Sequence, residues 1–213
     1  MKTLLRSPFA RSLAVLIILH TVGVLGLLSP WKEWIIILTP INLLISAIIL
    51  WYNSPQRSDG LFVAMLVLWY VLGFLVEVWG VNSGIIFGEY VYGTVLGPKF
   101  SATPLIIGVN WLMLLLATSA TLANFRFALS VKVLLTALLM VGLDVMIEPV
   151  AVALDFWQWK GGDIPLQNYV AWFITAALLA ALQFPLGRVR YFALAPYFLI
   201  IQALFFILLR LFY

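Results

Sequence analysis

Residues 127–149 decide the fold, and their sequence is FALSVKVLLTALLMVGLDVMIEP. The charged residues in this stretch are Lys132 near its start and Asp144 and Glu148 near its end. At ~1.5 Å per residue, a helix of this length crosses the ~30 Å of hydrocarbon in a membrane. The stretch therefore predicts a transmembrane helix that carries two carboxyl groups inside the bilayer.

The whole chain has the composition of this stretch. Hydrophobic residues make up 65% of its 213 residues and charged residues 9%, with a mean hydropathy of +1.13, whereas charged residues make up ~25% of soluble domains. We expect an all-α, polytopic integral membrane bundle with a single transmembrane domain over residues 1–213 and an uncleaved first span. About seven spans are predicted, at 10–28, 34–52, 61–80, 103–123, 127–149, 168–186 and 190–212.

Basic residues orient the predicted bundle. Eight lie on the side of the N-terminus, namely Lys2, Arg6, Arg11, Arg57, Arg126, Lys132, Arg188 and Arg190. Four lie on the other side, namely Lys32, Lys99, Lys160 and Arg210. This bias predicts a multi-pass protein of the cell (cytoplasmic) membrane with a cytoplasmic N-terminus, and with the two longer connections, 81–102 and 150–167, outside. The basic residues form no face beyond short loops, so no nucleic-acid partner is expected.

Three acids lie inside predicted spans, all in the outer half of the membrane. Glu77 belongs to the third span, and Asp144 and Glu148 belong to the fifth. A carboxylate at bilayer depth costs at least ~2.5 kcal/mol, so such residues usually take part in chemistry or transport. Asp144 and Glu148 are four residues apart and share one helix face, where two close carboxyls cannot both ionise easily. One of them is expected to hold a proton, although a purely structural role between helices stays open for all three.

Two further polar features have structural alternatives. Gly73, Glu77, Gly80 and Gly84 form a stripe on the third span, along which a neighbouring helix can approach closely. His20 either donates a hydrogen bond between helices or relays protons. With one histidine and no cysteine in the chain, no metal site is expected.

Aromatic residues gather at the same outer level as the acids. One interpretation is an aromatic belt at the membrane–water interface. The alternative is a pocket wall whose aromatic faces stabilise a cation. The set contains Trp79, Tyr90, Tyr92, Trp111, Trp157, Trp159, Tyr169 and Trp172.

Four ordered motifs carry a resemblance to a known family. They are EVWGVNSGIIFGEYVY at 77–92, followed by LGPK at 96–99 and Pro104; DVMIEP at 144–149; WQW at 157–159; and IPLQNYVAW at 164–172. Together they make residues 70–175 resemble the membrane carotenoid 1',2'-hydratases, which include γ-carotene hydratases of bacteria and bisanhydrobacterioruberin hydratases of haloarchaea. One departure is Glu148-Pro149, where the family pattern has Asp-Pro.

The resemblance implies hydration of the terminal (psi-end) double bond of an acyclic-ended carotenoid, without a cofactor. Asp144, Glu148 and Glu77 are then the expected catalytic acids, with the proton donor among them left open. The implied partners are lycopene, γ-carotene or a related carotenoid from the lipid phase, membrane lipid, and other carotenoid-biosynthesis enzymes. The expected substrate-binding residues are Trp79, Asn82, Glu89, Tyr90, Tyr92, Asn110, Trp111, Trp157, Trp159, Asn168 and Trp172.

Three alternatives remain at this stage. A carotenoid end-group cyclase or isomerase begins with the same protonation but excludes water. A proton-coupled transporter also places paired acids in the membrane, although the polar residues here stop halfway and leave no path through the inner leaflet. A structural assembly factor would need none of the acids for a product.

Overall fold

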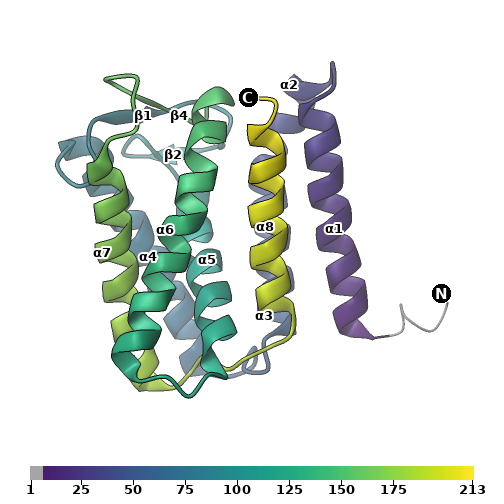
Figure 1. The fold of residues 1–213 in the computed structure, drawn as a ribbon, viewed down its shortest axis with the longest axis vertical. Coiled ribbons are helices and arrows are strands. Elements are labelled where there is room, and N and C mark those ends of the chain that lie inside the picture. Colours follow the sequence, from purple (N-terminus) through teal and green to yellow (C-terminus); the bar gives the residue numbers. More distant parts are fainter. Residues whose placement is uncertain (1–6) are drawn as a thin grey trace.

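The computed structural model describes residues 7–213, which form a bundle of helices that run along one common direction (Figure 1). Five helices are long and apolar enough to cross a membrane, and α3 and α8 are shorter apolar helices. The several apolar helices indicate a multi-pass membrane protein. The helices are α1 (Pro8–Leu27), α2 (Lys32–Ile36), α3 (Thr39–Asn53), α4 (Gly60–Ser83), α5 (Ile106–Ala123), α6 (Leu129–Ala153), α7 (Leu166–Gln183) and α8 (Leu194–Arg210).

Six of the seven predicted spans each correspond to one helix, with ends that differ by up to four residues. The prediction for residues 34–52 was wrong at its start. The chain there forms the short helix α2 and then α3, with the break at Ile37 and Leu38. Pro40 lies in the first turn of α3, and because proline lacks an N–H and clashes with the preceding turn, the helix cannot continue through it from α2.

Local signals set the helix ends. Ser7 Oγ accepts a hydrogen bond from the Ala10 N–H at the start of α1, and Asp59 Oδ1 accepts one from the Leu61 N–H at the start of α4. Gly84 ends α4 in the left-handed conformation, with φ of 67°, and its N–H donates to the Gly80 carbonyl.

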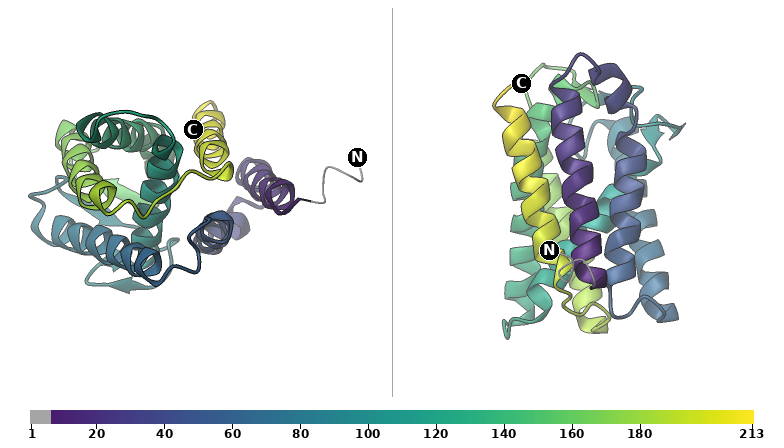
Figure 2. Two further views of the ribbon diagram at one scale, coloured as in Figure 1. Left: turned by 90° about the horizontal axis from the view of Figure 1, so that it is seen from below. Right: turned by 90° about the vertical axis from the view of Figure 1, so that its right-hand side faces the viewer.

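The central helix of the bundle is α5, which contacts α3, α4, α6, α7 and α8. Figure 2 shows α4, α6 and α7 on one side of it and α1, α3 and α8 on the other. Its surface is apolar nearly all round and buried along most of its length, as expected for a helix enclosed by its neighbours. The molecule thus has two clusters of helices that share α5.

The two longer connections lie at the same end of the bundle, as predicted, but they contain short strands that the sequence did not predict (Figure 1). Strand β1 (Tyr90–Tyr92) pairs antiparallel with β4 (Trp157–Trp159), and β2 (Lys99–Phe100) pairs with β3 (Thr103–Pro104). The connections approach closely at Gly93, where a Cβ atom would lie 1.9 Å from the Asp155 carbonyl oxygen. A residue with a side chain therefore cannot replace this glycine without moving the backbone.

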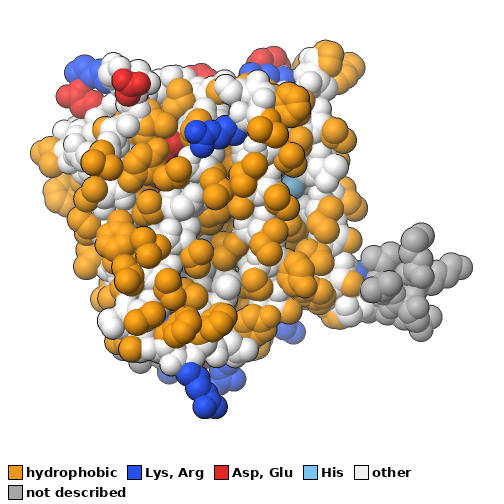
Figure 3. Space-filling model, viewed as in Figure 1, with side chains coloured by type: hydrophobic (Ala, Val, Ile, Leu, Met, Phe, Trp, Pro, Cys, Tyr) orange, Lys and Arg blue, Asp and Glu red, His pale blue; other side chains and the backbone are white. Residues whose placement is uncertain are grey.

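Helix α1 begins at one end of the bundle and α8 ends at the other (Figure 1). In the face that Figure 3 shows, lysines and arginines project from the end where α1 begins, and acidic side chains gather at the opposite end together with further lysines or arginines. Lys2 and Arg6, which contributed to the predicted orientation, lie outside the described residues. The assignment of the basic end to the cytoplasm stays a prediction.

Candidate active site

Glu77, Asp144 and Glu148 line one small cavity at the end of the bundle where the strands lie. Glu77 comes from α4, and the other two acids come from successive turns of α6. Their exposed fractions are only 4%, 1% and 2%. The cavity measures about 20 Å³, which is room for about one water molecule. The fold therefore collects all three intramembrane acids around one nearly closed space.

The outer wall of the cavity is the pair of strands β1 and β4, which we call the aromatic ribbon (Tyr90–Tyr92 and Trp157–Trp159). Tyr90 faces Trp159 in the ladder, and Tyr92 faces Trp157. Because side chains alternate along a strand, these four rings lie on one face of the ribbon, and all four line the cavity. Both tyrosines and Trp159 are buried, and Trp157 is partly buried.

Glu77 accepts three hydrogen bonds. The hydroxyls of Tyr90 and Tyr92 donate to its Oε2 at 2.6 and 2.9 Å, and the indole N–H of Trp111 on α5 donates to its Oε1 at 2.9 Å. Two of the donors come from the ribbon, so Glu77 ties the outer connection to the helices. Both carboxyl oxygens are occupied by donors, as suits an ionised carboxylate.

The two tyrosines remain donors over the physiological pH range. Burial, and then the negative charge of Glu77, raises the pKa of both hydroxyls well above the ordinary value of 10.0. The ring of Tyr90 lies 4.9 Å from that of Trp159, centroid to centroid. The ribbon therefore presents a fixed set of neutral O–H and N–H groups to the acids below it.

Glu148 also accepts three hydrogen bonds. The indole N–H groups of Trp157 and Trp159 donate to its Oε2 at 3.0 and 2.9 Å. Its Oε1 accepts from the side-chain amide of Asn168 on α7 at 3.0 Å. Asn168 is buried, and its amide nitrogen also donates to Asp144 Oδ2 at 2.9 Å. One amide thus bridges the two acids of α6.

Asp144 differs from the other acids in one respect. Its Oδ1 is buried and has no hydrogen-bond partner among the described residues. Glu77 and Glu148 each use both oxygens, whereas Asp144 uses only Oδ2. An unpaired buried oxygen is costly unless it carries a proton that it can give to a ligand or water.

The inner walls of the cavity are aromatic and apolar. Trp172 of α7 lines the cavity, and Trp111 stacks on it with ring centroids 4.1 Å apart but does not itself line the cavity. Asn110 also lines the cavity, as do Phe87 and Ile107, which sequence reasoning missed because an apolar side chain carries no chemical signal. Ten of the fourteen predicted site residues, including the three acids, line this cavity. Two of the ten, Tyr90 and Trp159, also line an outer groove beside it.

The glycine stripe of α4 was the sequence signal that could have predicted close packing beside the cavity. A Cβ at Gly80 would lie 2.4 Å from the ring of Phe87, and a Cβ at Gly73 would lie 2.5 Å from Trp111 Cβ. Gly73 therefore admits the neighbouring helix, as predicted, while Gly80 admits a ring from the connection that follows its own helix.

The structure does not bring Trp79, Asn82 and Glu89 to the cavity. Trp79 is 64% exposed on the outside of α4. The amide of Asn82 donates to Ser101 and holds the loop between β2 and β3. Glu89 pairs with Lys160 on the outer surface. These residues fit a lipid-facing and loop-supporting role better than contact with a reacting group.

His20 lies in another part of the bundle. Its Nδ1–H donates to the Leu16 carbonyl at 2.8 Å, and its Nε2 accepts from the Gln202 amide of α8 at 3.1 Å. This geometry matches a hydrogen bond between helices. Among the described residues, no group of three or more His, Asp and Glu side chains is arranged to hold a metal ion.

Comparisons with known proteins agree with the motifs. Residues 34–209 match the carotenoid biosynthesis protein family. Over 145 residues, the chain is 31% identical to the bisanhydrobacterioruberin hydratase of Haloarcula japonica, in a match that covers 62% of this chain and 46% of the relative. The match thus spans less than half of the relative's length, and no solved structure matches. Because the family match covers most of the sequence, the chain belongs to the carotenoid biosynthesis protein family.

Proposed function

We propose that this protein hydrates the terminal double bond of an acyclic-ended carotenoid by acid catalysis. The family and the similarity to a hydratase support a carotenoid substrate. The observation that carries the reaction type is the contrast among the acids: two carboxylates accept three hydrogen bonds each, and Asp144 keeps one buried oxygen unpaired beside a cavity with room for about one water. A protonated acid, a carboxylate and water are what alkene hydration requires.

Asp144 is the proposed proton donor. Every neighbour that bonds to Glu77 or Glu148 is a donor, which a carboxylate satisfies with both oxygens. Oδ1 of Asp144 faces no donor among the described residues, so this oxygen can carry the proton. Asn168 holds Oδ2, which leaves Oδ1 as the unpaired oxygen of a residue that lines the cavity.

The steps balance without an added reagent. Asp144 transfers its proton to one alkene carbon, and the positive charge develops on the adjacent tertiary carbon. Water adds to that carbon and gives a proton to Glu148. This proton then returns from Glu148 to Asp144. The two acids are one turn apart on α6, and both accept a hydrogen bond from the Asn168 amide. The net change is the addition of one water across the double bond.

The cation is proposed to lie among the stacked rings and the charge of Glu77. Trp172 and Glu77 both line the cavity, and Trp111 connects them by stacking on Trp172 and donating its N–H to Glu77. Such faces contribute up to ~2 kcal/mol when water is excluded. At about 20 Å³ the cavity is too small for an isoprenoid end group, so the substrate must displace part of the wall as it enters from the lipid.

The proposal also includes the orientation of the protein in the membrane and the route of the substrate. We propose seven membrane crossings, counting the shorter helices α3 and α8, with a cytoplasmic N-terminus and the active site in the outer leaflet. Lycopene, γ-carotene or a related carotenoid would then enter laterally, and other carotenoid-biosynthesis enzymes would supply it. The proposed chemistry assigns no role to a cofactor.

Expression in cells that accumulate lycopene or γ-carotene tests the proposal. The expected product is heavier than the pigment by one water, and the Asp144→Asn variant should produce none while reaching the membrane in equal amount. A cyclised product of unchanged mass would show that the activity is that of a cyclase and not of a hydratase. No new pigment from any acyclic-ended carotenoid would overturn the proposal.

A further inference from the structure

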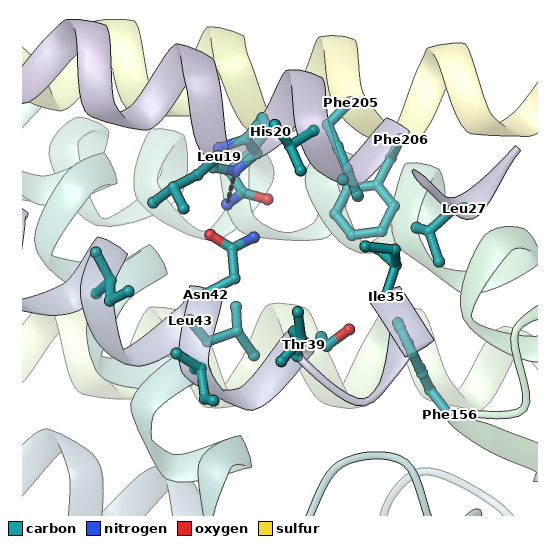
Figure 4. Close-up of a pocket in the computed structure, with 16 residues that line it drawn as sticks. Leu19, His20, Leu27, Ile35, Thr39, Asn42, Leu43, Phe156, Phe205 and Phe206 are labelled. Atoms are coloured by element: carbon teal, nitrogen blue, oxygen red, sulfur yellow. Dashed lines mark hydrogen bonds between the residues drawn. The ribbon is translucent and has the colours of Figure 1, made fainter. Parts of the chain in front are cut away.

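A second pocket lies on the other side of α5 from the acids, between α1, α3 and α8 (Figure 4). Its volume is about 190 Å³, roughly the space of six water molecules in the liquid. None of its sixteen lining residues is an acid, a lysine or an arginine. Leu27, Phe156 and Ile35 belong to its apolar wall (Figure 4).

Three polar side chains face one another across this apolar pocket. The carboxamide of Asn42 on α3 points toward the hydrogen-bonded pair of His20 and Gln202 on the opposite wall (Figure 4). The Leu16 carbonyl can only accept, so Nδ1 of His20 carries the hydrogen there, and in the neutral ring Nε2 accepts from the Gln202 amide. The Oδ1 of Asn42 is buried and has no partner among the described residues.

The pocket is accessible from the outside of the bundle. Val22 of α1 and Ile41 of α3 belong to its lining, yet they are 52% and 53% exposed. In contrast, His20 and Gln202 on its inner side are 5% and 6% exposed. Since the exposed sides of these helices face lipid in a membrane, an apolar molecule can enter between α1 and α3.

We propose that this pocket binds an uncharged apolar alcohol from the membrane, with its hydroxyl on Asn42. An acceptor oxygen without a partner needs a donor. An apolar cavity disfavours free water, whereas a hydroxyl on an apolar chain satisfies both the oxygen and the walls. The absence of charged side chains from the lining disfavours phosphate and carboxylate head groups.

This pocket is separate from the acid cavity and stands independently of the proposed reaction. The two spaces have no lining residue in common, although Phe156 lines the pocket and its neighbour Trp157 lines the acid cavity. Two sources supply a ligand of this chemistry. One is the tertiary alcohol end that hydration would produce, and the other is an ordinary long-chain membrane alcohol.

Photocrosslinking to the protein in lipid nanodiscs tests the proposal. The probes are a diazirine-bearing C15 isoprenoid with a tertiary hydroxyl, a straight-chain primary alcohol of equal carbon number, and the isoprenoid with hydrogen in place of the hydroxyl. An alcohol should label the peptides of α3 and α8 at the pocket about three- to tenfold more than the hydrocarbon, the effect of one net hydrogen bond. Preference for the tertiary alcohol identifies a product-like ligand, and equal labelling by both alcohols identifies membrane alcohols in general.

Asn42→Leu is the test variant, because leucine keeps the branched heavy-atom skeleton of asparagine and removes the acceptor. The alcohol and hydrocarbon probes should label this variant to the same extent. The variant should remain folded, since the substitution removes an unpaired buried oxygen. Asp144→Asn is the control and should keep the wild-type preference for alcohol, whatever its own activity. Equal labelling by alcohol and hydrocarbon in the wild type, or an undiminished preference in Asn42→Leu, would overturn the proposal.

Discussion

Replacing Glu148 by Gln should destabilise the protein, whereas replacing Asp144 by Asn should not, although each change removes activity. Three N–H donors converge on Glu148, from Trp157, Trp159 and Asn168. Glutamine has one oxygen and one NH₂ group, so in either orientation its NH₂ group faces at least one of these donors. In Asp144→Asn, the new NH₂ group can occupy the position of Oδ1, which has no donor beside it, and the oxygen keeps the bond from Asn168.

The magnitude follows from these contacts. One unpaired buried donor costs about 1–3 kcal/mol, and each bond that changes from charged to neutral loses about 1 kcal/mol. With the glutamine oxygen facing the two indoles, one donor is left unpaired and two bonds weaken, so the sum for Glu148→Gln is roughly 3–5 kcal/mol. This lowers the melting temperature by about 6–20 °C in a chain of this size. For Asp144→Asn, no bond of the wild type is lost, and a shift below about 4 °C is expected.

Thermal unfolding in detergent, followed by tryptophan fluorescence, measures both shifts against the wild type. Product formation from a carotenoid in vesicles, measured in parallel, should fall at least about 100-fold in each variant, the usual loss for a general acid or base. Equal melting temperatures for the two variants would refute the donor arrangement around Glu148. Retained activity in Asp144→Asn would refute the assignment of the proton donor.

Three further predictions concern the ribbon, the glycine stripe and the source of oxygen. The folded-state pKa of Tyr90 and Tyr92 lies well above 10.0. Their contribution to stability is therefore complete below about pH 10 and is lost as pH rises beyond it. Urea titrations from pH 7 to 11 should show this loss of stability in the wild type and a smaller loss in the variant with Phe at both positions. Gly80→Ala should lower stability by about 1–3 kcal/mol because its Cβ would lie 2.4 Å from Phe87, and thermal unfolding would disagree if the variant matched the wild type. Under anaerobic conditions, oxygen-18 water should label the product alcohol by mass spectrometry, and dependence on molecular oxygen would contradict the acid mechanism.

Hydropathy was sufficient to predict most of the helices. Long apolar runs have few alternatives in a membrane, since a spanning segment must satisfy its own backbone groups. The same reasoning found the acids, because Glu77, Asp144 and Glu148 are conspicuous in such runs. It failed at the break before α3, where the sequence is apolar on both sides and Pro40 indicates the start of a new helix.

The aromatic ribbon could not be predicted in the same way. Each strand has only three residues, which is too short for an alternating pattern to be distinguished from an irregular loop. The partner of each strand lies in the other connection, so the pairing depends on the packing of the helices that bring the connections together. The sequence identified the aromatic residues but not the face that they share or the oxygen to which each donates.

The ribbon also gives two acids on one helix face different surroundings, which supports the different roles proposed for them. A spacing of four residues separates Asp144 from Glu148 by ~6 Å along α6. Only Glu148 contacts the indole N–H groups of the ribbon, and Asp144, one turn deeper, shares only the amide of Asn168. In this chain the position nearer the ribbon carries Glu, whose additional methylene extends its reach toward Trp157 and Trp159. The surrounding donors therefore favour a carboxylate at the outer position, and we propose that the inner position holds the proton that acid-catalysed addition of water requires.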